Sequence, residues 1–232
     1  MQGILEGRLA EPVEVTASRL APYGPRAVGY ATRRVAEVAP DVVLVSVSAF
    51  ACTVGLVYAR VGERFGDRAQ RMYQSLEGRY SGLIAPHVDG PSPDAFLRTV
   101  ARKVIGTSTL APVEEVGGAY GRILHELAQD ERLQVIVIGE SFFSRNLQHT
   151  NPGMSAKIEQ LRAIVRPAAE THRFPWVDVE AAFQAGGNRE QFFLRDGVHN
   201  SAAGHQSVAE VVAAGVLELH AAPGEKITLA PR

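Results

Sequence analysis

Asp196 and His199 are the residues of this chain whose types and spacing best suit chemistry. They lie three positions apart in residues 193–205, which read FLRDGVHNSAAGH and directly precede a helical pattern. A carboxylate at this spacing can accept a hydrogen bond from one ring nitrogen of the imidazole, which fixes the tautomer and leaves the other nitrogen free to take a proton. The pair is therefore predicted to supply the base and the orienting acid of a hydrolase triad. The plainer interpretation is that Asp196 only forms a turn and that His199 is a partly buried structural residue.

The residues that follow this pair strengthen the catalytic interpretation. The segment resembles the last sequence block of the SGNH, or GDSL, hydrolases, a superfamily of serine ester hydrolases. In that block Asp-x-x-His is followed by small residues with Gly-His and then by the C-terminal helix. Asp196, His199, Gly204 and His205 match it position by position. The resemblance implies an esterase or acyl hydrolase in which Asp196 and His199 are catalytic, whereas His205 is expected to be structural.

The resemblance also implies a fold, and the segment pattern supports the same class. The SGNH hydrolase fold is a three-layer α/β/α, flavodoxin-like fold with a mainly parallel sheet, and strand-like and helix-like segments alternate along this chain. Residues 12–15, 40–45 and 176–179 are similar to the second, third and fifth strands of the family. Nothing corresponds to the first strand, which we expect to be missing. The apolar runs 42–47 and 133–138 are predicted to be adjacent central strands.

The remaining segments predict helices, one long loop and a single domain. A β-branched run at 13–16 is read as a short strand, and Asn200 or Ser201 is the expected N-cap of the closing helix. Residues 1–222 are expected to form one SGNH-like domain, and 223–232 a loosely attached tail. Helices are predicted at 26–38, through most of the stretch from the strand at 42–47 to residue 79, at 94–104, 112–128, 154–171 with a kink at Pro167, and 201–219; residues 81–94 are predicted to be a loop.

The nucleophile that such a base would serve is missing from the sequence. In the family the serine belongs to a Gly-Asp-Ser motif after the first strand, and no Gly-Asp-Ser occurs in this chain. The enzyme hypothesis therefore places the serine upstream of Met1, in a chain with a truncated N-terminus. A second candidate is Ser141, which follows the apolar run 133–138 in Gly139-Glu140-Ser141, although that strand is the fourth in the family's order. A loop serine that bonds nearby backbone is the plainer interpretation of Ser141.

The positions expected to bind an oxyanion also depart from the family pattern. Gly24 is the candidate for the family's glycine, although the nearby Pro22 has no N–H to donate. The family's asparagine, expected at the end of the third strand, is absent, and Phe50 or Cys52 occupies that place. Ser48 is the candidate for a substitute donor there, with Ser46 and backbone N–H groups as alternatives.

Composition excludes several other classes of function. The formal net charge of −1 gives no reason to expect nucleic acid as a partner, and no apolar run is long enough to cross a bilayer. One cysteine and scattered histidines give no metal-ligand spacing, so no metal and no cofactor are expected. The N-terminus lacks a signal-peptide pattern, so a cytoplasmic location is expected unless a signal lies upstream. The expected partner is a small-molecule ester or acylated substrate, and the oligomeric state stays open.

Two hypotheses remain open from the sequence. The first is an SGNH-type ester hydrolase with His199 as general base. The second is a non-catalytic relative that binds or interacts but has lost the nucleophile and the oxyanion asparagine.

Overall fold

A three-stranded parallel sheet lies at the centre of the computed structural model, which describes residues 1–84 and 104–221, with the side chains of 76–84 and 150 excepted. The strands are β1 (Val42–Ser46), β2 (Gln134–Gly139) and β3 (Trp176–Asp178), in the order β1-β2-β3. In this register Val45 is opposite Val137, which is opposite Trp176. The two predicted central strands are therefore adjacent and parallel, and the predicted α/β class is confirmed.

Helices fill most of the connections between the strands. In chain order they are α1 (Gln2–Leu9), α2 (Ala27–Val38), α3 (Phe50–Thr53), α4 (Val57–Ile84), α6 (Val113–Leu127), α7 (Arg145–Thr150), α8 (Met154–Thr171), α9 (Val179–Ala185), the short 3-10 helix η1 (Arg189–Phe192) and α10 (Ala202–Ala221).

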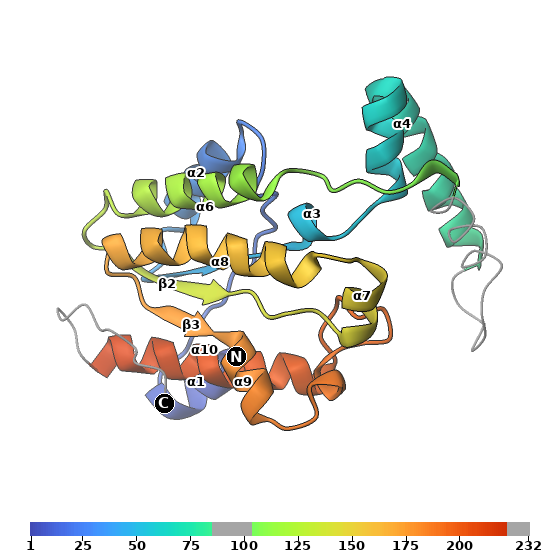
Figure 1. Cartoon of the computed structure of the whole chain (residues 1–232). Helices are drawn as coiled ribbons and strands as arrows, with labels where there is room; N and C mark the ends of the chain where they lie inside the picture. Colours follow the sequence, from blue (N-terminus) through green and yellow to red (C-terminus); the bar gives the residue numbers. More distant parts are fainter. Residues whose placement is uncertain (85–103, 222–232) are drawn as a thin grey trace.

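Alternating side chains of the strands build two separate apolar layers. One face of the sheet, which includes Val45 and Val137, packs against α6 and α8 in the largest buried cluster. The opposite face, which includes Ile136 and Val177, packs against α10. This two-residue alternation is what a pleated strand covered on both sides produces. Figure 1 shows the resulting layers, with α6 and α8 on one side of the sheet and α10 and α1 on the other.

Local signals in the sequence explain where the main helices begin. Pro112 precedes α6, where its missing N–H costs no hydrogen bond, and acidic residues occupy the first turn. Asp178 caps α9 by accepting from the Ala181 N–H, and the Ser201 hydroxyl accepts from the Gly204 N–H at the start of α10. Ser201 is thus the cap of the closing helix, as predicted. Pro167 lies inside α8, which continues through it.

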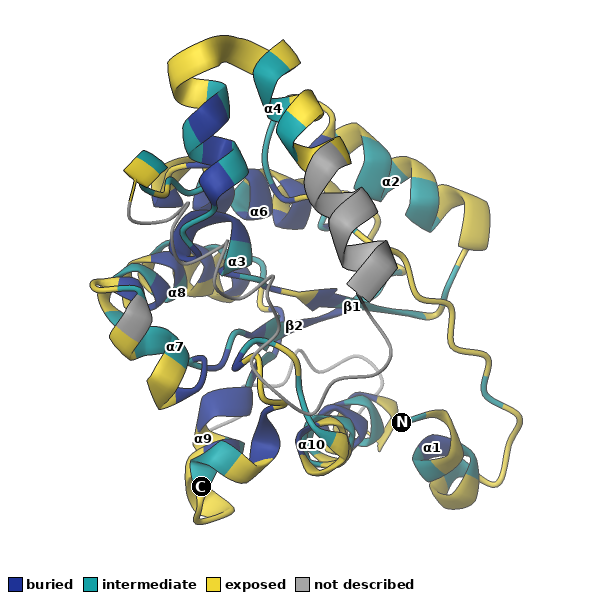
Figure 2. Cartoon of the chain, turned by 90° about the vertical axis from the view of Figure 1, so that its right-hand side faces the viewer, coloured by how far each residue is buried: buried dark blue, intermediate teal, exposed yellow. Residues whose placement is uncertain are grey.

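The prediction of a strand at residues 13–16 is wrong. The segment is irregular and largely exposed, and its backbone joins no sheet. A β-branched run forms a strand only where a neighbouring strand pairs with it, and among the described residues β1 pairs with β2 alone. The outer edge of β1 is therefore without a strand partner in the described part of the chain. Figure 2 shows β1 beside β2, at the edge of the sheet.

The helix after β1 extends further than predicted. Helix α4 includes residues 81–84, which were predicted to be part of a loop, and it is interrupted at Gly66, whose φ is 80°. Helix α4 projects from the body of the protein (Figure 1). The rest of the predicted loop, nearly all of the predicted helix at 94–104 and the predicted tail at 223–232 lie outside the described residues. None of the helices that are described has the length and apolar character needed to span a membrane.

Candidate active site

The carboxylate of Asp196 hydrogen-bonds both the backbone of its own loop and the ring of His199. Its Oδ1 accepts hydrogen bonds from the backbone N–H groups of Val198 and His199, at 2.9 and 3.0 Å. Its Oδ2 lies 2.6 Å from Nδ1 of the His199 ring. The hydrogen bond predicted from the three-residue spacing is therefore present, and the backbone bonds fix the carboxylate from the other side.

The loop that carries this pair is closed at its base. Phe193 and Asn200 form an isolated antiparallel bridge, and the Leu194 N–H donates to the His199 carbonyl at 2.7 Å. Gly197, at the turn, has a φ of 74°. This left-handed conformation favours glycine, because a side chain there meets the backbone. The short Asp-Gly-x-His stretch thus forms a defined loop.

The Asp196–His199 pair faces solvent. The side chain of His199 is 73% exposed and that of Asp196 is 49% exposed. Partial burial of the Asp196 carboxyl acts to raise its pKa, but the hydrogen bonds from His199 and Val198 prevail, so the pKa lies below its ordinary value. Within the described residues, no group hydrogen-bonds Nε2 of His199. The ring nitrogen that a catalytic base would use is thus open.

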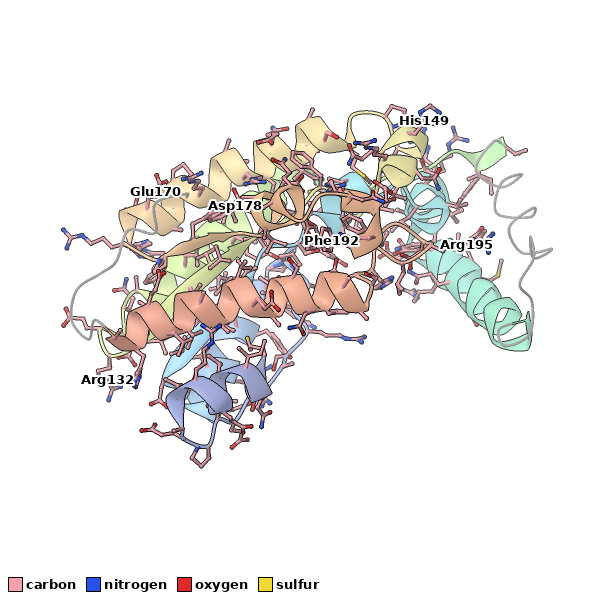
Figure 3. The ribbon with its side chains drawn as sticks, turned by 90° about the horizontal axis from the view of Figure 1, so that it is seen from below. Arg132, His149, Glu170, Asp178, Phe192 and Arg195 are labelled. Atoms are coloured by element: carbon pink, nitrogen blue, oxygen red, sulfur yellow. The ribbon has the colours of Figure 1, made fainter. Side chains whose placement is uncertain are left out.

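The loop is attached to the carboxyl end of the central strand. The backbone N–H of Ser144, which follows β2, donates to the Gly197 carbonyl at 3.1 Å. In Figure 1 the arrows of β2 and β3 point toward α7 and α4, and Figure 3 shows Arg195 at that end of the molecule, with Arg132 at the other. In open parallel sheets ligands gather beyond the carboxyl ends of the strands. The Asp196–His199 pair lies at this end.

Glu140 joins the carboxyl ends of β1 and β2. Its Oε2 accepts a hydrogen bond from the Ala49 N–H at 2.7 Å, and its carboxylate also accepts from the Ser48 hydroxyl and the Ser141 N–H. Burial raises the pKa of Glu140 to about 7, although these hydrogen bonds act in the opposite direction. The segments after the two strands are thus held together by one carboxyl group that titrates near neutrality.

The backbone donors at the end of β1 are already used inside the protein. The Ser48 N–H donates to the Tyr120 hydroxyl at 2.8 Å, and that hydroxyl lies 3.1 Å from the Ser46 carbonyl, to which it donates. Burial raises the pKa of Tyr120, so it stays a neutral phenol. Phe50, one of the two residues expected at the place of the family's asparagine, begins α3, and the other, the buried Cys52, follows it.

The other two residues singled out from the sequence have separate surroundings. Gly24, with a φ of 77°, donates its N–H to Oε1 of Glu115 at 3.0 Å, at the start of α6. Ser141 is buried, and its hydroxyl does not hydrogen-bond His199. The structure therefore joins the loop of Asp196 and His199 to the end of β2, whereas Gly24 is held by α6.

Sequence reasoning missed a buried ion pair beside this site. Arg189 of η1 and Glu180 of α9 are joined by two hydrogen bonds, and both contact the backbone of the β2–α7 loop, residues 140–144. The two residues are nine positions apart across a turn, so no periodic pattern relates them. In the folded structure, the burial of both charged side chains is what identifies Arg189 and Glu180 as a pair. Among residues 1–84 and 104–221, no cluster of three or more His, Cys, Asp or Glu side chains is arranged to hold a metal ion.

Comparison with known proteins gives a family and three similar solved structures. The sequence matches the GDSL-like Lipase/Acylhydrolase family over residues 17–207. No curated protein sequence matches the chain. A lipase/acylhydrolase from Enterococcus faecalis is 18% identical with a TM-score of 0.39; the match covers 45% of this chain and 51%, about half, of that one.

Two further structures match over a larger share of their length. LAE5, an alpha/beta hydrolase enzyme from the metagenome of Lake Arreo, is 19% identical over 76% of this chain and 95% of its own, with a TM-score of 0.41. A putative GDSL-like lipase from Parabacteroides merdae is 16% identical over 75% of this chain and 95% of its own, with a TM-score of 0.40. The family match covers most of the sequence, and the chain therefore belongs to the GDSL-like lipase/acylhydrolase family.

Proposed function

We propose that this protein hydrolyses ester bonds of a small acylated substrate, with His199 as the general base and Asp196 as the residue that orients it. The observation that carries the proposal is the 2.6 Å contact between Nδ1 of His199 and Oδ2 of Asp196, with Nε2 open to solvent. An imidazole held by a carboxylate at Nδ1 presents an unprotonated Nε2, which is the form that accepts a proton from a nucleophile.

The reaction that fits this pair proceeds through an acyl-enzyme. Nε2 of His199 takes the proton of a serine hydroxyl while the serine oxygen attacks the ester carbonyl. The same proton then passes to the departing alkoxide, so an alcohol leaves and an acyl-serine remains. Water, deprotonated by His199, releases the acid and restores the serine. Because the sequence contains no Gly-Asp-Ser, the proposal places this serine upstream of Met1.

A second candidate is a non-catalytic relative that binds a ligand on the same fold. Phe50 or Cys52 is expected at the place of the family's oxyanion asparagine, and neither a phenyl ring nor a buried thiol replaces an amide donor. The adjacent N–H groups of Ser48 and Ala49 donate to Tyr120 and Glu140, so they do not face a substrate. These contacts favour a site without an oxyanion hole at the end of β1.

Hydrolysis of a short-chain aryl ester and labelling by a fluorophosphonate, which reacts with activated serines, distinguish the candidates. The 232-residue chain is expected to be inactive, whereas a form extended upstream through a Gly-Asp-Ser is expected to turn over and to be labelled on that serine. Activity of the extended form should be lost in His199→Ala. Turnover by the 232-residue chain, abolished in Ser141→Ala, would identify Ser141 as the nucleophile instead. Absence of turnover and labelling in both forms would favour the binding protein.

A further inference from the structure

Arg189 and Glu180 form a buried ion pair with matched geometry. The Nε and Nη2 atoms of Arg189 donate to Oε1 and Oε2 of Glu180 at 3.1 and 3.0 Å, in the two-pronged arrangement that a guanidinium and a carboxylate favour. The side chains are only 13% and 6% exposed. Removing one member of such a pair leaves an uncompensated charge in the interior, so the two residues depend on each other.

The same pair holds the backbone of the β2–α7 loop. Nη1 of Arg189 donates to the Phe143 carbonyl at 2.7 Å, and Oε2 of Glu180 accepts from the Phe142 N–H at 2.9 Å. One acceptor and one donor of consecutive loop residues are therefore satisfied by the two charged side chains. This loop begins with Glu140 and Ser141 at the carboxyl end of β2 and ends at Ser144.

Arg189 also contacts the base of the loop that carries the Asp196–His199 pair. Its guanidinium lies over the Phe193 ring, 5.0 Å from the ring centroid. Phe193 is the residue that bridges to Asn200, and its neighbour Leu194 donates to the His199 carbonyl. The guanidinium thus touches both the β2–α7 loop and the closed base of the Asp196–His199 loop.

Two further hydrogen bonds link these loops and the helices next to them. The Ser144 N–H donates to the Gly197 carbonyl at 3.1 Å, and the Arg145 N–H donates to Oε1 of Glu190 at 3.0 Å. Both are single hydrogen bonds between segments, and Glu190 adjoins Arg189 in η1. The ion pair is the part of the connection that is buried and charged.

We propose that Arg189, paired with Glu180, is a positioning residue that fixes the Asp196–His199 loop against the carboxyl end of β2. This inference rests on the proposed function, in which the pair is the acid–base element of the site. Arg189 contacts neither Asp196 nor His199, so it acts through the two loops. A lysine cannot replace it, because one ammonium group cannot make the two bonds to Glu180 and the bond to Phe143 in a single plane.

Native-state amide hydrogen exchange of the full chain, followed by NMR, tests this role. In Arg189→Lys the amides of Phe142, Ser144 and Leu194 are expected to exchange at least about tenfold faster, because the loops open locally. The Val137 amide, which donates to the Pro175 carbonyl inside the sheet, is expected to exchange as before. The ring resonances of His199 are expected to shift in the same variant.

Arg162→Lys is the matched control. Arg162 is also 13% exposed and pairs with a carboxylate, that of Asp178, but its salt bridge lies between α8 and the end of β3. This variant is expected to leave the Ser144 and Leu194 amides and the His199 ring unchanged. If Arg189→Lys does not fold, Glu180→Gln, which keeps the volume of the side chain, is expected to give the same pattern of exchange.

The outcomes separate this inference from the proposed function. Equally faster amide exchange at Ser144 and Val137 would overturn the positioning role, because it would report general destabilisation. Unchanged exchange at Ser144 would also overturn it, because the loop would then be unaffected. Exchange is measured without substrate, so a protein that hydrolyses no ester would still support or reject the role of Arg189. Conversely, turnover that survives unchanged in His199→Ala would refute the proposed chemistry alone.

Discussion

Gly197 and Ser144 lie so close that a β-carbon on the glycine would be 2.1 Å from the serine Oγ. The two residues are also joined by the hydrogen bond from the Ser144 N–H to the Gly197 carbonyl. This Oγ is itself engaged, because it accepts from the Leu147 N–H as the N-cap of α7. The Asp196–His199 loop therefore meets the end of the β2–α7 loop at a point where only glycine fits.

Gly197→Ala is expected to destabilise the protein more than an ordinary substitution of a left-handed glycine. Gly187→Ala is the control, because Gly187 has a φ of 87° and open space around its α-carbon. The control is expected to lower the free energy of unfolding by roughly 1–2 kcal/mol. Gly197→Ala should cost at least about 1 kcal/mol more, since the methyl group also overlaps Ser144. Urea denaturation measures both, and equal losses would contradict the close contact.

Asp196→Asn is expected to reverse the tautomer of His199. The amide oxygen can still accept from the Val198 and His199 N–H groups, which places the amide nitrogen against Nδ1 of the ring. A donor there requires an unprotonated Nδ1, so the proton moves to Nε2. The ¹⁵N shifts of the neutral ring report this exchange, with His205 as an internal reference. In a form that turns over, kcat should fall on the order of 10³–10⁴-fold; unchanged ring shifts would count against the orienting role.

Glu140→Gln is expected to change how stability depends on pH. The pKa of Glu140 is raised in the folded protein from 4.5 to about 7, so the folded state keeps a proton that the unfolded state releases. The free energy of unfolding therefore decreases as the pH rises from about 4.5 to 7, and the decrease is complete above pH 7. The variant should be more stable than the parent at pH 8 by roughly 1–3 kcal/mol and equal to it near pH 4. The exposed Glu218→Gln is the control, and parallel stability curves for Glu140→Gln and the parent would disprove the raised pKa.

The thiol of Cys52 is expected to be unreactive in the folded protein. Cys52 is fully buried in α3, and burial raises its pKa to about 11. Since the thiolate is the nucleophile, alkylation by iodoacetamide at pH 8 should be at least roughly a hundredfold slower than in the unfolded chain. Mass spectrometry of native and urea-unfolded samples measures the two rates. Comparable rates would mean that α3 opens readily.

The strands and most helices of this fold could be predicted because their signals are local. The apolar runs that became β1 and β2 contribute side chains to an apolar layer on each face of the sheet, and this is what a continuous apolar run indicates. Pro112 and Ser201 indicate helix starts because their effects depend only on the neighbouring backbone. The prediction of a strand at residues 13–16 was wrong because β-branched residues favour an extended backbone but do not themselves provide a neighbouring strand to pair with.

The candidate site was predictable in part for the same reason. The Asp196–His199 hydrogen bond lies within one loop, and its spacing alone is enough to suggest it. The ion pair of Glu180 and Arg189, and the placement of Glu140 between β1 and β2, depend on how segments far apart in the sequence pack together. No local pattern contains that information, so only the folded structure reveals these residues.

In the described part of the chain the outer edge of β1 pairs with no other strand, and we expect this edge to be a template for aggregation. Backbone N–H and C=O groups along Val42–Ser46 that point away from β2 can hydrogen-bond a strand of another molecule, and Val43 and Leu44 beside them are apolar. Edge-to-edge association becomes more frequent as the protein concentration rises. We therefore expect the protein concentration to limit the yield of unaggregated protein before temperature does.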